Sequence, residues 1–452
     1  MNQAWDACGG DIALTELITI DRTDQILPSA FDVTGLVADT TSAALLAVAE
    51  LHAMRNGSSV LPVELDVANA CAAFGSERHI QTVGWELPPT WDPIAGDYQT
   101  SDGWIRLHTN YSYHRDAVCE VLGVAAERDL VAAEVATWSS LELEAAVVNN
   151  NGAAAALRTE TDWASSTPGQ AVAAEPLVSS RTASSTAPLD LPPSERPLAG
   201  VRVLDLTRVI AGPTATGFLA GYGADVLRID PPGFEEVPLV LPIVTAGKRC
   251  ASLDLKTEAG RERFASLVAS AHVLVTSLRG DALDRLGFDQ AALWNLNPGL
   301  VVARNAAYGW SGPNAARRGF DSLVQMSTGI ADTGRTLSGA EKPTPLPVQA
   351  LDYGSGYLMA AAVIRGITQR LDTGFGSEHK VSLARTARWL ADRPRPTERP
   401  PALDPTPYLE SATTAWGPIV RVKALAGIPG ITPTFDFEPG NLGRHQPHWT
   451  TE

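Results

Sequence analysis

The sequence predicts an α/β protein built on a parallel, doubly wound sheet. Between about residues 198 and 391, short apolar runs alternate with helical segments at the spacing of β-α-β units. The chain has 452 residues, of which 44% are hydrophobic. That is enough for sizeable cores and favours about two to three domains.

The central region supplies the elements of this sheet. Its expected strands are short and mostly apolar: 201–206, 225–230, 251–255, 272–278 and 299–307. A segment of small residues, 212–223, is expected as a helix that ends at glycine. A second helix is expected at 256–271, where Thr257 is the predicted N-cap and apolar residues recur on one face.

The N-terminal half has a mixed pattern. An apolar helix is expected at 43–57, a hairpin at 98–108 with Ser-Asp-Gly at its turn, and a helix at 116–124. Residues 43–74 also resemble residues 356–390 weakly, because both have the pattern of apolar helix, glycine-containing turn, strand and helix. The position that matches Asp352 in the first copy is close to Val37, so only the second copy keeps the carboxylate.

Two stretches have the composition of linkers. Residues 179–197 are rich in Ser, Thr, Ala and Pro, and residues 392–407 are similar. They divide the chain into residues 1–178, residues 198–391 and a C-terminal segment, 408–452.

Composition argues against several classes of partner and location. The formal charge is −16 and there is no basic stripe, so neither nucleic acid nor a membrane surface is expected as a partner. No apolar run reaches the ~20 residues that span a bilayer, and the N-terminus lacks a basic signal region. The four cysteines form no CxxC pair and are expected as reduced thiols. Together these features predict a cytoplasmic protein.

Common catalytic and cofactor motifs are missing. The glycines of "GYGADV" (221–226) follow a predicted helix and precede a strand, which is not the order of a dinucleotide-binding turn. The eight histidines have no metal-ligand spacing, so no metal site is expected. There is also no G-x-S-x-G sequence of a serine hydrolase.

Asp352 raises the main question of function. In "PLPVQALDYGSGYLMAAAVI" (345–364) it stands just before Gly354-Ser355-Gly356 and a long apolar helix. One interpretation is a helix cap, which this pattern alone favours, and the same holds for Asp321 in "GPNAARRGFDSLVQMSTGI" (312–330). The other interpretation is that a ligand comes very close to the carboxylate.

Four segments resemble the class III CoA-transferase family, in the order that this family has. They are "LAGVRVLDLTRVIAGPTATGFLAGYGADVLRID" (198–230), a second beginning "GKRCASLDLK" (247–289), "NPGLVVARNAAYGWSGPNAARRGFDSLVQMSTG" (297–329) and "LDYGSGYLMAAAV" (351–363). The family contains formyl-CoA transferase and carnitine CoA-transferase, and its superfamily includes α-methylacyl-CoA racemase.

This resemblance implies a fold and an activity. The fold is a Rossmann-like sheet with a smaller α+β domain, in an interlocked homodimer. The substrates are an acyl-CoA and a free carboxylic acid, and no cofactor or metal is held permanently. Asp352 matches the family's nucleophile, which forms a covalent aspartyl intermediate. Gly354 and Gly356 are expected to leave room for the acyl-CoA.

The resemblance also implies a set of CoA contacts. They fall in the turn after the first strand, in the section expected to hold the adenine and ribose phosphate, in the next loop and helix, and at the substrate end. The matching residues are Val209, Ile210, Ala211, Leu253, Lys256, Ser277, Leu278, Arg285 and Tyr308.

Several positions depart from the family pattern. Ile210 replaces a frequent glutamine, Pro231 replaces an arginine of formyl-CoA transferase, and Ala306 replaces a lysine. Specificity for formyl and oxalyl groups therefore does not carry over. The racemases have a histidine where this chain has Phe320, which favours transferase chemistry. A racemase or isomerase and a catalytically degenerate CoA-binding member remain alternatives, and the acyl group stays open.

The order of the halves is also unusual. The pattern of the family's small domain, "YQTSDGWIRLH", precedes the Rossmann-like segment, and a short C-terminal stretch resembles the family's end. The chain therefore resembles a family-like second half followed by a family-like first half. The fold would be completed within one chain or across a dimer.

Overall fold

A seven-stranded sheet forms the centre of the molecule in the computed structural model, which describes residues 2–22, 24–186, 188–397 and 399–450. Its strand order is β10-β9-β8-β11-β12-β13-β7. The strands are β7 (Ser179–Ser185), β8 (Arg202–Leu206), β9 (Asp225–Asp230), β10 (Lys248–Ser252), β11 (Val273–Thr276), β12 (Val301–Ala306) and β13 (Phe375–Ser382). All pairings are parallel except that of β7 with β13.

The strand order sets where a ligand is expected. Numbered along the chain, the six parallel strands lie in the order 3-2-1-4-5-6, so the direction of winding changes between β8 and β11. In open α/β sheets, ligands bind at the carboxyl ends of the strands beside such a change. A ligand-binding site is therefore expected beside the segments that follow β8 and β11, around residues 207–211 and 277–280.

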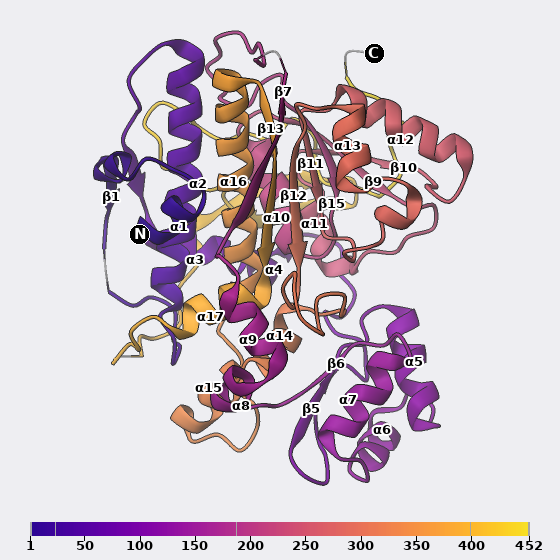
Figure 1. The fold of residues 1–452 in the computed structure, drawn as a ribbon. Coiled ribbons are helices and arrows are strands. Elements are labelled where there is room, and N and C mark those ends of the chain that lie inside the picture. Colours follow the sequence, from indigo (N-terminus) through magenta and orange to yellow (C-terminus); the bar gives the residue numbers. More distant parts are fainter. Residues whose placement is uncertain (1, 23, 187, 398, 451–452) are drawn as a thin grey trace.

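Different helices cover the two faces of the sheet (Figure 1). On one face, α12 (Glu258–Ser270) and α13 (Gln290–Leu296) pack on the strands through side chains such as Phe264, Leu267 and Leu293. On the other face lie α10 (Ala211–Gly221), α16 (Ala350–Thr373) and α2 (Val33–Asn56). The mixed α/β architecture with a parallel sheet agrees with the sequence prediction.

The weak internal repeat corresponds to a repeated unit. Helix α2 is followed by β2 (Val63–Leu65) and α3 (Val67–Ala73), as α16 is followed by β13 and α17 (Leu383–Ala391). The two long helices contact each other and end at left-handed glycines, Gly57 and Gly374. Aligning these ends places Gly35, not Val37, at the position of Asp352.

A smaller antiparallel sheet lies beside the main one (Figure 1). It contains β4 (Gly96–Gln99), β5 (Trp104–Leu107) and β6 (Ala154–Ala156), covered by α5 (Ser112–Leu122), α6 (Arg128–Val135) and α7 (Ser140–Asn149). The predicted hairpin at 98–108 is β4-β5, with Gln99 opposite Trp104.

The remaining elements connect these units. They are α1 (Asn2–Ala7), η1 (Ile12–Leu17), β1 (Ile18–Ile20), α4 (Ser76–His79), β3 (Gln81–Thr82), α8 (Glu160–Ser165), α9 (Thr167–Ala174), η2 (Pro238–Val240), α11 (Leu241–Val244), η3 (Asp284–Leu286), α14 (Asp321–Ser327), α15 (Ile330–Ser338), η4 (Thr406–Tyr408), β14 (Leu409–Thr414) and β15 (Gly417–Val422). Strands β14, β15 and β3 form a small sheet, and β1 pairs with β2.

Three local expectations need correction. Residues 179–185, expected in a linker, form β7, because the backbone of an extended polar segment can pair with the free edge of β13. The strand expected at 251–255 runs from 248 to 252. Gly354-Ser355-Gly356, which were placed before the long apolar helix, already lie within it, since α16 begins at Ala350.

Helix α2 also begins earlier than the expected residue 43. It is long and apolar enough to cross a membrane by length and composition alone, and 89% of its most apolar stretch is buried inside the protein.

Candidate active site around Asp352

Asp352 lies in the first turn of α16 and is buried, with 7% of its surface exposed. It does not cap its own helix. Instead Asp321 Oδ2, from the start of α14, accepts hydrogen bonds from the backbone N–H groups of Leu351 and Asp352, each at 2.9 Å. The Gln325 side chain donates to the other oxygen of Asp321. Among the described residues, no hydrogen bond to the Asp352 carboxylate is found, so this carboxylate is available for another partner.

Three buried carboxyl groups meet here. Burial, and then the charges of Asp321 and Glu77, raise the pKa of Asp352 well above its usual value. Burial likewise raises the pKa of Asp321 to about 6. The pKa of Glu77, which comes from α4, is raised by burial as well, and the Tyr353 hydroxyl donates a hydrogen bond to Glu77 Oε2 at 2.7 Å. Such shifts in a cleft are typical of functional carboxyl groups.

A cavity of about 330 Å³ opens on one side of Asp352. It lies at the carboxyl ends of β8 and β11, where the strand order predicts a ligand, and residues of the small sheet's α5 close its far side. Four cationic side chains line it: Arg208, Arg279, Arg317 and Arg318. Of the described residues around it, Asp352 alone is acidic. We name it the arginine cavity.

A smaller cavity of about 60 Å³ lies on the other side of Asp352. His108, Phe320, Ile210 and Glu77 are among the residues that line it. The rings of His108 and Phe320 stack in parallel, with centroids 3.6 Å apart. Burial lowers the pKa of His108 well below its usual value, so this imidazole is neutral at pH 7. We name this space the inner cavity.

The backbone is strained where the two cavities meet. Val209 lines both and has a φ of 64°, which is unusual for a β-branched residue. Its N–H donates to Glu236 Oε2 at 3.1 Å, and Arg228 and the Tyr111 hydroxyl also bind the Glu236 carboxylate. Strain of this kind persists when surrounding contacts hold it, and it is common at functional sites.

The structure brings several of the expected CoA contacts together with Asp352. Val209, Ala211, Ser277 and Leu278 line the arginine cavity, and Ile210 lines the inner cavity.

Other expected contacts do not line these two cavities. Leu253 packs beside the core under α12, and Lys256 is exposed just before that helix. Arg285 is exposed and pairs with Asp281 at 3.0 Å. Tyr308 is fully buried, with its hydroxyl 3.0 Å from Ser327 Oγ.

The two glycines after Asp352 have a different role from the one expected. A Cβ at Gly356 would lie 2.6 Å from the Ala211 carbonyl oxygen, and a Cβ at Gly354 would meet Leu36. Both glycines face neighbouring helices, so the room they leave is used for helix packing and not for an acyl-CoA.

Sequence reasoning missed all four arginines of the cationic wall. Arg208 and Arg279 lie in the segments that follow strands β8 and β11, and that position was the available signal. Arg317 and Arg318 stand in the "AARRGFD" loop, whose basic pair could also have been used. Glu77 lies far away in the sequence and offered no local signal.

Comparison with known proteins decides the family. Residues 198–410 match the sequence model of CoA-transferase family III. This part of the chain belongs to that family. The matched segment contains all six parallel strands and Asp352. Residues 1–197 lie outside the match, so the rearranged order of the halves stays a prediction.

Relatives of this CoA-transferase family III segment cover part of the chain. The acetyl-coenzyme A transferase nodX of Hypoxylon pulicicidum is 33% identical over 200 residues, 43% of this chain and 34% of that protein. The probable fatty acyl-CoA transferase Rv3272 of Mycobacterium tuberculosis is 31% identical over 233 residues, which are 46% of this chain and 59% of that protein. A formyl-CoA:oxalate CoA-transferase of Rhodopseudomonas palustris is 33% identical over 193 residues, which are 40% of this chain and 45% of that protein. The matches thus span about a third to three fifths of these relatives.

Solved structures similar to this chain include two proteins. A crystal structure of Rv3272 from M. tuberculosis has a TM-score of 0.40 and 31% identity, covering 43% of this chain and 57% of that one. A CAIB/BAIF family protein from Brucella suis has a TM-score of 0.39 and 26% identity, and the match covers 49% of this chain and 65% of that one.

Within the described residues, no group of three or more His, Cys, Asp or Glu side chains could hold a metal ion.

Proposed function

We propose that the protein transfers coenzyme A from an acyl-CoA to a free carboxylic acid, with Asp352 as the nucleophile. One observation carries the proposal: the buried Asp352 carboxylate stands between a cavity lined by arginines and a smaller inner cavity. A thioester held with its CoA in the first cavity and its acyl carbon at the second would meet this carboxylate.

The charges of the arginine cavity suit the phosphates of CoA. In the described part of the chain, neither Arg279 nor Arg318 pairs with an acidic side chain, and Arg279 helps burial to lower the pKa of Arg318. Arg208 lies over the Phe234 ring at 3.8 Å, which orients its guanidinium. Arg208 and Arg317 pair with Asp230 and Glu144, so the uncompensated guanidinium groups are those of Arg279 and Arg318. Such groups bind phosphate oxygens strongly.

The chemistry needs no other group. A carboxylate oxygen of Asp352 attacks the thioester carbonyl carbon, and the C–S bond breaks. CoA leaves as a thiolate, and the acyl group stays on Asp352 as a mixed anhydride. The thiolate then attacks the Asp352 carbonyl, which releases the first acid and leaves an aspartyl-CoA thioester. The acceptor carboxylate then attacks the aspartyl-CoA thioester, which releases the CoA thiolate and forms a second anhydride. The thiolate attacks the carbonyl carbon of the acceptor in this anhydride, which gives the new acyl-CoA and frees the Asp352 carboxylate. Each step exchanges one acyl bond for another, so ATP is not consumed.

The strand order and the helices on both faces support the finer description of the sheet as doubly wound and Rossmann-like. The family resemblance supports a homodimer, and the acidic composition supports a cytoplasmic location. Light scattering of the purified protein tests the dimer.

A racemase or isomerase is the second candidate, and His108 favours it. The family position that lacks its histidine is Phe320, and the His108 ring stacks on that phenyl ring beside Asp352 in the inner cavity. A neutral imidazole and a carboxyl group form an acid-base pair. Exchange of the α-proton of an acyl-CoA with solvent deuterium, without movement of CoA between acids, would select this candidate.

Trapping of the intermediate tests the transferase proposal. The protein is incubated with acyl-CoAs from acetyl to octanoyl, treated with hydroxylamine and digested, and the peptides are measured by mass spectrometry. We expect a modified Asp352, absent from Asp352→Asn. Asp372→Asn, at the exposed end of the same helix, is the matched control and keeps the modification. Transfer that persists in Asp352→Asn would contradict the proposal.

A further inference from the structure

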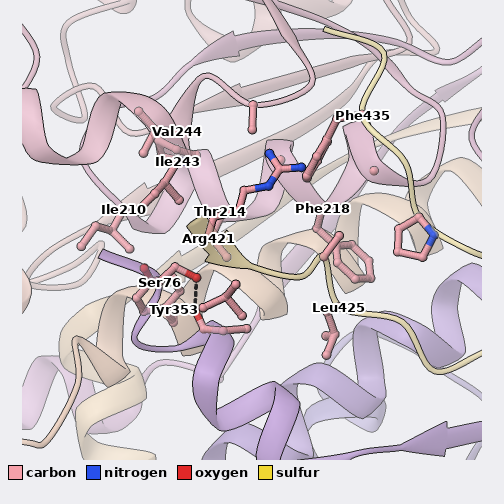
Figure 2. Close-up of a pocket in the computed structure, with 18 of the residues that line it drawn as sticks. Ser76, Ile210, Thr214, Phe218, Ile243, Val244, Tyr353, Arg421, Leu425 and Phe435 are labelled. Atoms are coloured by element: carbon pink, nitrogen blue, oxygen red, sulfur yellow. Dashed lines mark hydrogen bonds between the residues drawn. The ribbon is translucent and has the colours of Figure 1, made fainter. Parts of the chain in front are cut away.

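A third cavity, of about 120 Å³, has mainly apolar walls (Figure 2). It lies between α10, the first turns of α16, α11 and the C-terminal segment around β15. Phe218, Tyr222, Tyr357, Phe435 and Ile243 are among the side chains that line it. In Figure 2, Ile210 and Tyr353 stand on one side of this space and Phe435 and Leu425 on the other. In another protein, a closed cavity of about 150 Å³ lined by Leu, Ile and Phe binds benzene, so a space of this size can hold a ring or a short chain.

This cavity is separated from the inner cavity by only a few side chains. Glu77, Ile210 and Val240 line both spaces, and Asp352 lines the inner one. The third cavity therefore adjoins the space beside Asp352, across these three side chains. Ile210 thus forms part of the boundary between the two spaces.

We propose that the third cavity binds the apolar tail of the acyl group, and that the preferred substrates are monocarboxylic acids with a chain or ring of about six carbons. This inference rests on the proposed transferase function and specifies the substrate class of the same site. Burial of such a tail in an apolar pocket provides binding free energy in proportion to the area removed from water.

A polar atom at the junction also points to a ligand. Glu77 Oε1 is buried and has no hydrogen-bond partner among the described residues, and its nearest cation, Arg78 Nε, is 3.6 Å away. A buried oxygen without a partner is costly, so its place between two cavities is explained if a bound molecule contacts it. Burial raises the pKa of Glu77, and the protonated form of this carboxyl group can donate a hydrogen bond to a carbonyl oxygen.

The far wall argues against a second carboxylate on the substrate. Arg421 lines the cavity, but its Nε donates to Glu410 Oε1 at 3.0 Å and its guanidinium lies 4.9 Å from the centroid of the Phe435 ring. Its charge is therefore already balanced by an acidic side chain. Lys423 also lines the cavity, and its Nζ donates to the Pro407 carbonyl oxygen at 2.9 Å. With Arg421 paired and the remaining walls mainly apolar, an apolar end group fits this space.

Gly217 permits a direct test. It lines the third cavity from α10, and a Cβ built on it meets no atom within 4 Å. Gly217→Leu fills the cavity and replaces glycine with a better helix former, so the fold should be kept. We expect the ratio of kcat/KM for octanoyl-CoA to that for acetyl-CoA, with labelled acetate as common acceptor, to fall at least tenfold. Gly103→Leu, in the β4-β5 turn with equally open space, should keep the wild-type ratio.

A binding measurement distinguishes failure of the proposed acyl subsite from failure of the proposed transferase function. Calorimetry on Asp352→Asn, which cannot form the intermediate, should show tighter binding of octanoyl-CoA than of acetyl-CoA, and Gly217→Leu in that background should remove the difference. That result supports the subsite even if no transfer is found with any acyl-CoA. An unchanged chain-length ratio in Gly217→Leu would overturn it. So would a preference for adipyl-CoA over hexanoyl-CoA that Arg421→Gln abolishes.

Discussion

The protonation of a single residue, Asp352, governs the proposed reaction. Its side chain is buried, accepts no hydrogen bond from the described residues, and stands near the charges of Asp321 and Glu77. These surroundings disfavour the ionised form, yet only the ionised carboxylate attacks a thioester. The same lack of solvation makes the carboxylate, once formed, a stronger nucleophile.

The pH dependence follows from the sign of this shift. Since the pKa of Asp352 is raised, the ionised fraction grows as pH rises, and kcat/KM should increase about tenfold per pH unit below a midpoint well above that of an ordinary carboxyl group. Glu77→Gln removes one neighbouring charge and keeps an oxygen for the Tyr353 hydroxyl, so the midpoint should move to lower pH. A pH profile of kcat/KM measures both. A midpoint near pH 4 in the wild type would contradict the expected burial effect.

At the scale of elements, two glycines set how closely α16 approaches its neighbours. Gly356 touches the backbone of α10, where a Cβ would come within 2.6 Å of the Ala211 carbonyl oxygen. Gly354 faces only side-chain atoms of Leu36 and Thr386, at 3.4 to 3.6 Å. The contact at Gly356 holds the turn after β8 against the start of the helix that carries Asp352.

Alanine at these two positions should therefore have opposite effects. Gly356→Ala forces a backbone shift and should lower the free energy of unfolding by about 1–3 kcal/mol. Gly354→Ala places its methyl group at ordinary contact distance and should leave stability unchanged or raise it by up to about 1 kcal/mol, because alanine favours helix. Chemical denaturation measures both. Equal effects of the two variants would contradict the proposed close approach.

The whole molecule is held together by the two copies of the repeated unit. Helices α2 and α16 lie side by side in one core, and β7 from the N-terminal part completes the sheet of the matched segment. At Gly35, the counterpart of Asp352, a Cβ would lie 2.3 Å from Arg393 Nη2. Arg393 pairs there with Asp32 at 2.8 Å and with Asp39 at 2.6 Å. The first copy thus holds an ion-pair cluster where the second holds the candidate nucleophile.

Arg393 should matter for the stability of the entire chain. Arg393→Met leaves two largely buried carboxylates without their shared cation and should cost about 3 kcal/mol. Arg388→Met breaks an exposed pair with Asp392 and should cost less than about 1 kcal/mol. Urea unfolding followed by circular dichroism gives both values. Because the two parts share a core, we expect one transition, and separate transitions for them would contradict a shared core.

Local patterns in the sequence were sufficient for much of the fold. Alternating apolar strands and helices predicted the parallel sheet. β9 and the N-cap at Thr257 lie where expected, because the apolar pattern of a strand and the cap of a helix are set by residues adjacent in the sequence. The family resemblance pointed to Asp352 and to the turn at residues 209–211.

The sequence by itself determined the class of fold, the family of residues 198–410 and the residue that matches the nucleophile. Tertiary structure alone decided the surroundings of that residue. Asp321 was expected to cap its own helix but caps α16, polar residues 179–185 became an edge strand, and Glu77, from the other half of the chain, approaches Asp352. Long-range contacts depend on how distant segments pack, and no local pattern of residues encodes that distance.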